Sequence, residues 1–146
     1  MRFGGNVSAV GVRCESGRDG ARARLMALAT STLGRTGHAA TRLGFGAMEL
    51  GGIAGVLPES QVERLLNGVL DAGINLIDTS PDYQASEELI GRHLADRRGE
   101  FFLASKCGCL VDRAPVLKDG KLEHDFSPKN VRAGVEQSLR RLKTDH

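Results

Sequence analysis

The sequence has no run of apolar residues approaching the roughly 18 to 20 that a membrane-spanning helix needs, so we expect no membrane span. Cysteine is scarce: the chain has three, an odd number, and two of them are only two positions apart. Such a set does not make a disulfide framework, which favours a reducing, cytoplasmic setting. Tryptophan is absent and tyrosine occurs once, at Tyr83.

The positive charge of the chain is unevenly distributed. The formal net charge is +2, and the first 25 residues carry five arginines against only Glu15 and Asp19. No basic patch is interleaved with aromatic residues elsewhere, so nucleic-acid binding has no support. Because this leader has no sustained periodicity and few large apolar residues, we expect residues 1–30 to be disordered. One hypothesis is that Met26 is the true start. The arginines weakly resemble a transit peptide, but the two acidic residues oppose that interpretation.

Strands and helices alternate from residue 31 onward, and the 115 or so residues that follow suffice for one domain. We predict a β-hairpin within 31–46, strands at 43–50, 74–78 and 101–104, and helices at 58–73, 86–98 and 127–142. Apolar stripes support the first and third helices: Val62, Leu65, Leu66, Val69 and Leu70, then Val131, Val135, Leu139 and Leu142. Residues 107–126 form a long loop with a small hairpin at 118–121, typical of lids and substrate walls. Regular βα alternation predicts a parallel sheet with helices outside, either doubly wound or a barrel.

The stretch 73–94, G-I-N-L-I-D-T-S-P-D-Y-Q-A-S-E-E-L-I-G-R-H-L, carries the candidate site. Asp78 stands where a buried strand ends, and Tyr83 follows five residues later in a loop. Ser86 is expected to cap the next helix, with Glu87 and Glu88 near its positive end. A carboxylate and a phenol at the carboxyl end of a parallel strand lie where α/β proteins place their chemistry.

Two other patterns are weaker. Gly44 and Gly46 form a G-x-G, but the glycines that follow are wrongly spaced for a dinucleotide fingerprint. Cys107 and Cys109 have no second pair of thiols, so we expect no metal site. The histidines are expected to lie in loops or on the rim of a helix, and Asp78, Tyr83 and the strand-end Lys106 each have an ordinary structural interpretation as well.

Four segments in order resemble the aldo-keto reductase family. They are L-G-R-T-G with T-R-L-G-F-G-A-M, the stretch 73–94 described above, F-F-L-A-S-K-C-G, and V-R-A-G-V-E-Q-S-L-R-R-L-K-T-D. The resemblance covers residues 31–146, and its Asp-to-Tyr segment is specific. It implies a (β/α)8 TIM barrel, of which this chain would contain the N-terminal β-hairpin and the first three βα units. A full barrel takes about 250 residues.

The resemblance also implies a reaction. Such enzymes transfer a hydride between a nicotinamide, usually NADP(H) with NAD(H) as the alternative, and the carbonyl carbon of a small aldehyde, ketone or sugar. An unperturbed phenol has a pKa of about 10, and a neighbouring ammonium favours the phenolate. By the match Tyr83 is the acid/base, Lys106 is the ammonium beside it, and Asp78 holds Lys106. Gly46, Ala47 and Met48, together with Asp78, would lie near the nicotinamide.

The match departs from the family at its end. The family's catalytic histidine closes a fourth strand, whereas His146 would stand at the start of that strand. The loops that bind the phosphates and adenine come from the last two barrel strands. We therefore predict an incomplete reductase that is inactive as residues 1–146. The alternatives are a non-catalytic short relative acting by self-association or partner binding, and an unrelated doubly wound binding domain in which Asp78, Tyr83 and Lys106 lie apart.

Overall fold

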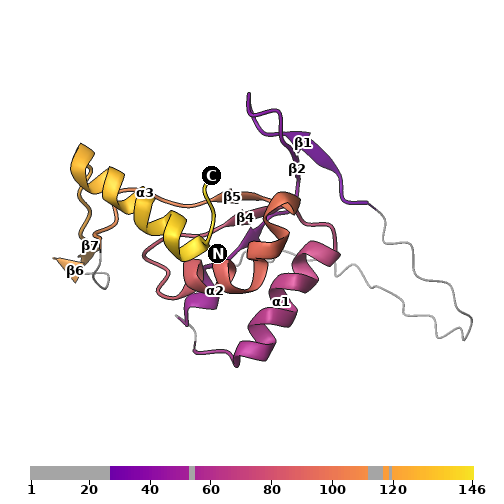
Figure 1. Ribbon diagram of the computed structural model, residues 1–146, viewed down its shortest axis with the longest axis horizontal. Helices are drawn as coiled ribbons and strands as arrows, with labels where there is room; N and C mark the ends of the chain where they lie inside the picture. Colours follow the sequence, from indigo (N-terminus) through magenta and orange to yellow (C-terminus); the bar gives the residue numbers. More distant parts are fainter. Residues whose placement is uncertain (1–26, 53–54, 112–116, 119) are drawn as a thin grey trace, which may run out of the picture.

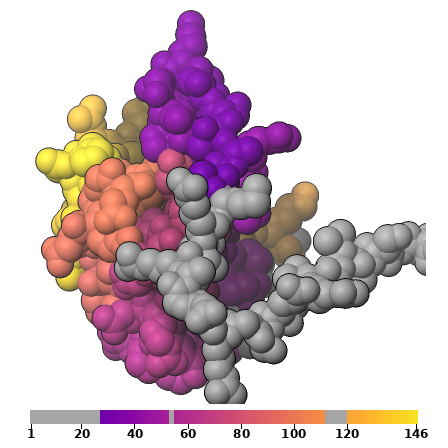
Figure 2. Space-filling model, turned by 90° about the vertical axis from the view of Figure 1, so that its right-hand side faces the viewer, coloured from indigo at the N-terminus to yellow at the C-terminus, as the bar shows by residue number. Residues whose placement is uncertain are grey.

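A β-hairpin opens the part of the chain that the structure describes. The computed structural model describes residues 27–52, 55–111, 117–118 and 120–146 (Figure 1). Strand β1 (Thr30–Thr32) pairs antiparallel with β2 (Ala39–Thr41), which confirms the predicted hairpin. Its turn places Gly34 and Gly37 at φ 53° and 76°, a backbone region that favours glycine. The hairpin projects from the body (Figure 2), and the predictions for residues 1–26 lie outside the described residues.

Three short parallel strands form the central sheet. They are β3 (Phe45–Gly46), β4 (Leu76–Asp78) and β5 (Phe102–Ala104), in the order β3-β4-β5. The register pairs Gly46 with Asp78 and Asp78 with Ala104, so the three carboxyl ends lie level with one another. The predicted parallel sheet is therefore confirmed. Among the described residues it stays an open sheet of three strands and does not close into a barrel.

Each strand is followed by a helix, and the helices gather on one side of the sheet (Figure 1). They are α1 (Glu59–Asp71), α2 (Ser86–Leu94) and α3 (Pro128–Leu142). Ser127 caps α3 by accepting a hydrogen bond from the Asn130 backbone N–H, as the sequence predicted. The core lies between sheet and helices, and its largest fully buried apolar side chains are Val62, Leu66, Ile77, Ile90 and Leu94. Within the described residues, no helix has the length and apolar character to span a bilayer.

Three details of the predicted elements are wrong. The strand predicted at 43–50 ends at Gly46, and a 3-10 helix, η1 (Met48–Gly51), follows because the chain turns to bury Leu50. The helix predicted to continue to residue 98 becomes the 3-10 helix η2 (Ala95–Glu100) after Leu94. Leu65 and Val135 lie within the apolar stripes but are 41% and 50% exposed, because no described element covers those positions.

The long loop after β5 contains a small hairpin of β6 (Leu117–Lys118) and β7 (Lys121–Leu122), as predicted. A separate antiparallel bridge pairs Cys109 with His124, so the two stems of the loop run side by side. The Asp125 backbone N–H also donates to the Gly108 carbonyl at 2.8 Å. These contacts fix both ends of the loop next to the carboxyl edge of the sheet.

Candidate functional site

The candidate site lies at the carboxyl edge of the sheet, where the three parallel strands end level. Asp78 is the last residue of β4, and Lys106 follows two residues after the end of β5. Both Asp78 carboxylate oxygens accept hydrogen bonds from Lys106 Nζ at 2.7 Å, and the Thr79 carbonyl accepts a third at 2.9 Å. An ammonium has three donors, so these acceptors can fix the orientation of Lys106 even though its side chain is 42% exposed.

Tyr83 lies beside this ion pair, in the turn between β4 and α2. The centre of its ring is 5.6 Å from Lys106 Nζ, within the range of cation–π attraction. The turn is held by two backbone hydrogen bonds, from the Tyr83 N–H to the Ser80 carbonyl and from the Ser86 N–H to the Tyr83 carbonyl, both 3.0 Å. A Cβ added to Gly51 would collide with that carbonyl, so η1 packs directly against the turn. The structure thus brings Asp78, Tyr83 and Lys106 together.

Two buried hydroxyl groups, those of Thr79 and Ser86, stabilise the turn. The Ser86 hydroxyl donates to the Ala47 carbonyl at 2.8 Å, and the Thr79 and Ser86 oxygens are 2.9 Å apart. Because Ser86 uses its own proton on Ala47, Thr79 is the donor in the second bond. The prediction that Ser86 caps α2 is therefore wrong: Ala85 is the N-cap residue and no side chain caps this helix. Ser86 instead links the segments that follow β3 and β4.

Glu87 is a second residue whose role the sequence did not reveal. We expected only that it lies near the positive end of the helix, and the structure shows in addition that its side chain is fully buried. It accepts a hydrogen bond from the Ser105 hydroxyl at 2.7 Å and lies 3.5 Å from the Arg141 guanidinium. Glu87, Ile90 and Leu94 have the spacing of one helix face, and that spacing was the available signal. This contact joins the segment before Lys106 to α2 and α3.

The residues predicted to lie near a nicotinamide flank the same edge. A Cβ added to Gly46 would have no atom within 4 Å, so open space adjoins this backbone. Met48 is 42% exposed on the same segment. Ala47 differs, because it is fully buried and its N–H donates to the Asp78 carbonyl at 2.8 Å. A planar ring could therefore approach Gly46, Met48 and the Asp78 side chain, while Ala47 connects β3 to β4.

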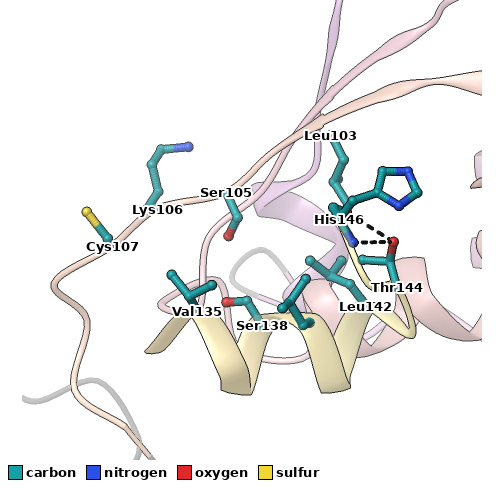
Figure 3. A pocket seen from close by; sticks show the side chains of 10 residues that line it. Leu103, Ser105, Lys106, Cys107, Val135, Ser138, Leu142, Thr144 and His146 are labelled. Carbon is teal, nitrogen blue, oxygen red and sulfur yellow. Dashed lines mark hydrogen bonds between the residues drawn. The ribbon is translucent and has the colours of Figure 1, made fainter. Parts of the chain in front are cut away.

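A pocket of about 260 Å³ lies next to this edge, between the segment after β5 and α3 (Figure 3). Its walls include Leu103, Ser105, Lys106, Val135 and Leu142. Asp78 and Tyr83 are not among the residues that line it, and Lys106 Nζ is held by Asp78 outside the pocket. The pocket is thus an open apolar groove beside the edge strand, and the three predicted catalytic residues do not converge in it.

A further polar cluster adjoins Tyr83. His124 Nε2 lies 3.0 Å from an Asp82 carboxylate oxygen, and the buried Cys109 Sγ lies 3.8 Å from the Ser80 hydroxyl. Burial, together with a hydrogen bond to Asp82, raises the pKa of the Cys109 thiol. Cys107 is exposed and takes no part. Sequence reasoning missed this cluster because its members come from three separate segments with no common spacing.

Comparison with known proteins gives a consistent result. The model of the Aldo/keto reductase family matches residues 42–146. L-galactose dehydrogenase of Arabidopsis thaliana is 34% identical over 119 residues, covering 78% of this chain and 34% of that protein. A solved structure from Pseudomonas aeruginosa assigned to the aldo-keto reductases is 37% identical with a TM-score of 0.70, covering 82% of this chain and 45% of that one.

Solved relatives include a complex with NADP. The aldo/keto reductase of Klebsiella pneumoniae in complex with NADP and acetate is 25% identical to this chain with a TM-score of 0.56. The match covers 82% of this chain and 37% of that one. This chain therefore spans less than half the length of each of these relatives.

Proposed function

The chain belongs to the aldo/keto reductase family of oxidoreductases, and from this premise we propose that it carries the proton-transfer residues of a carbonyl reductase. The reaction is reduction of an aldehyde or ketone, or in reverse the oxidation of an alcohol or sugar. The observation that carries the proposal is the pairing of Lys106 with Asp78 at 2.7 Å, with the Tyr83 ring beside it.

In this proposal Tyr83 donates its phenolic proton to the carbonyl oxygen as that oxygen gains negative charge. The phenolate left behind is stabilised by the Lys106 ammonium through charge attraction. Asp78 and the Thr79 carbonyl hold the ammonium so that it does not turn into solvent. Ser86, Thr79 and Gly51 keep the turn that bears Tyr83 in place, which limits the reorganisation that proton transfer requires.

The proposed cofactor is NADP(H), with NAD(H) as the alternative, and its nicotinamide supplies the hydride when bound. The open space at Gly46, the exposed Met48 and the half-exposed Asp78 fit a flat ring on this edge. Gly46 would allow close approach, because a side chain there would occupy the same space. The substrate is a small carbonyl compound or sugar, and the loop 107–126 would contribute one wall of its site.

The proposal is tested in a chimera in which residues 31–146 replace the corresponding part of the Pseudomonas aeruginosa relative. The relative supplies the rest of the barrel. We expect NADPH-dependent reduction of aldehydes, and a fall in kcat of about 100-fold or more in Lys106→Met, the scale of a general acid/base contribution. Lys121→Met, on the exposed hairpin of the loop, serves as the control and keeps full activity. A folded chimera in which both variants have equal kcat would refute the assignment.

A second candidate is a non-catalytic role through self-association. The open edges of the sheet support this role, because among the described residues no strand pairs with the outer edge of β3 or β5. Unpaired edges are templates for pairing with another chain. Multi-angle light scattering of residues 1–146 separates the two proposals. A single well-folded oligomer with no reductase activity favours this one, and a monomer or a polydisperse aggregate contradicts it.

A further inference from the structure

Three side chains of different chemistry converge at the base of the long loop, next to Tyr83. They are Asp82 from the turn after β4, Cys109 from the first stem of the loop, and His124 from the second stem. One ligand atom from each, a carboxylate oxygen, Sγ and an imidazole nitrogen, lies within 4.8 Å of the other two. Carboxylate, thiolate and imidazole are the donor types that zinc binds in proteins.

The distances between the three ligand atoms are close to those around a single tetrahedral zinc ion. At the bond lengths zinc prefers, the atoms of a tetrahedral set lie roughly 3 to 4 Å apart. His124 Nε2 and Asp82 Oδ2 already lie 3.0 Å apart. Cys109 Sγ lies within 4.8 Å of both of these atoms, so it must approach them to share one centre. A thiolate and a carboxylate carry two negative charges, which balance a divalent cation.

The surroundings hold these ligands in position. The backbone bridge between Cys109 and His124 fixes their relative placement. The Asn130 side-chain amide donates to the carbonyls of Cys109 and Asp125, at 3.0 and 2.7 Å. The His124 ring stacks on Phe126 with ring centres 6.0 Å apart. Such outer contacts orient the ligands of metal sites and reduce the reorganisation that binding would require.

We propose that Asp82, Cys109 and His124 form a zinc-binding site that clamps the two stems of the long loop, at Cys109 and His124, to the turn that bears Tyr83. On binding, the thiol proton of Cys109 is released to solvent as the sulfur–zinc bond forms. Three protein ligands leave the fourth tetrahedral position for water or the nearby Ser80 hydroxyl. The site includes neither Asp78 nor Lys106, so metal binding can be measured separately from the proposed reductase activity.

The test uses Co²⁺ as a spectroscopic probe on the full chain of residues 1–146 under reducing conditions. The starting protein is Cys14→Ser/Cys107→Ser, in which Cys109 is the sole remaining thiol. We expect one Co²⁺ per chain, with a thiolate-to-cobalt charge-transfer band and the strong visible absorption of a tetrahedral site. Added Zn²⁺ should displace the Co²⁺ and raise the Tm.

Ligand variants decide the outcome. Cys109→Ser should abolish the charge-transfer band, and His124→Asn and Asp82→Asn should each weaken Co²⁺ binding at least tenfold. His124→Cys places another zinc ligand at the same position, and we expect it to restore binding with a stronger charge-transfer band. Far-UV circular dichroism checks that each variant keeps its helices. The proposal is overturned by the absence of a charge-transfer band in the starting protein, by its retention in His124→Asn, or by its persistence in concentrated guanidinium chloride.

Discussion

At the scale of single residues, the two neighbouring cysteines of the C-G-C sequence have different environments. Cys107 is exposed, whereas Cys109 is 5% exposed and its pKa is raised, first by burial and then by its hydrogen bond to Asp82. The thiolate is the nucleophilic form, so a raised pKa and poor access both slow alkylation. In metal-free protein we expect iodoacetamide at about pH 8 to modify Cys107 at least tenfold faster than Cys109.

The sign of the pH dependence follows from the same shift. The folded-state pKa of Cys109 lies above its unfolded value, so its contribution to stability is complete below the unfolded value. That contribution is lost as the pH rises through the folded value. The same raised pKa delays ionisation of the Cys109 thiol, so its reactive thiolate fraction grows as the pH rises from 8 to 10. The ratio of the Cys107 alkylation rate to the Cys109 rate should therefore fall over this range. Peptide mass spectrometry measures both sites in one sample, and equal rates at pH 8 would contradict the buried placement of Cys109.

The buried Glu87 gives a second prediction at this scale. Its carboxylate is fully buried, and the Arg141 guanidinium lies 3.5 Å away with its side chain 24% exposed. Removing one partner of a buried charge pair leaves the other uncompensated. Arg141→Met should lower the free energy of unfolding by about 1–3 kcal/mol, measured by urea denaturation. Glu87→Leu/Arg141→Met should recover much of this loss, since no buried charge remains.

The matched control is Arg92→Met. Arg92 pairs with Glu59, but both side chains are half exposed, at 50% and 57%. Exposed ion pairs contribute little to stability. We expect the unfolding midpoint of this variant to match that of the parent. A loss as large as that of Arg141→Met would show that burial of Glu87 is not the deciding feature.

At the scale of elements, the crossing of α2 and α3 depends on Gly91. A Cβ at this position would collide with the Arg141 carbonyl and lie 2.7 Å from two Leu142 backbone atoms. Gly91→Ala should therefore force the helices apart and cost roughly 1–3 kcal/mol, as overpacking does. Gly134→Ala is the control in α3, because nothing lies within 4 Å of its added Cβ. Alanine there should instead stabilise the helix by about 0.5–1 kcal/mol. Thermal unfolding with the same sign for both variants would contradict the packing.

Some of the helices and strands can be predicted from the sequence, and others cannot. The helices α1 and α3 and the strands β4 and β5 are foreseeable because apolar spacing, Pro and Ser127 mark them locally. The 3-10 helix η1 is not, because only the tertiary burial of Leu50 explains why the strand ends early.

The same distinction applies to the site. The strand-end positions of Asp78 and Lys106 made their proximity predictable once the strands were taken as parallel and adjacent. The role of Ser86 cannot be predicted from its local sequence, because its partners, Thr79 and Ala47, lie on other segments. The cluster of Asp82, Cys109 and His124 depends on how the long loop folds back, and no local pattern encodes that contact.

At the scale of the whole molecule, the described residues form a sheet of three parallel strands with helices on one side. Leu76 and Phe102 pair on the face opposite Ile77 and are only partly buried, which fits a sheet whose other side is not fully covered. The relatives are more than twice as long as the matched region, and a closed barrel normally converges catalytic groups from several strands. The described residues therefore contain the proposed acid/base residues on an open sheet that matches part of such a barrel.

Residues 1–146 expressed alone should show negligible NADPH-dependent carbonyl reduction, because three strands cannot enclose a cofactor and substrate away from water. We also expect this protein to bind the dye ANS, through the open face of its sheet and the apolar groove beside α3. A spectrophotometric assay of NADPH oxidation with a panel of aldehydes measures the activity. Clear turnover that disappears in Tyr83→Phe would show that this part of the chain suffices for catalysis.

The most direct test of the central claim is the Tyr83→Phe substitution in the chimera with the Pseudomonas aeruginosa relative, followed by kcat and the Kd for NADPH. The substitution removes one oxygen atom and leaves the ring against Lys106. If Tyr83 delivers the proton, kcat falls about 100- to 10,000-fold while the Kd for NADPH stays within about twofold. A variant that keeps its fold and retains kcat within about threefold of the parent would contradict the account.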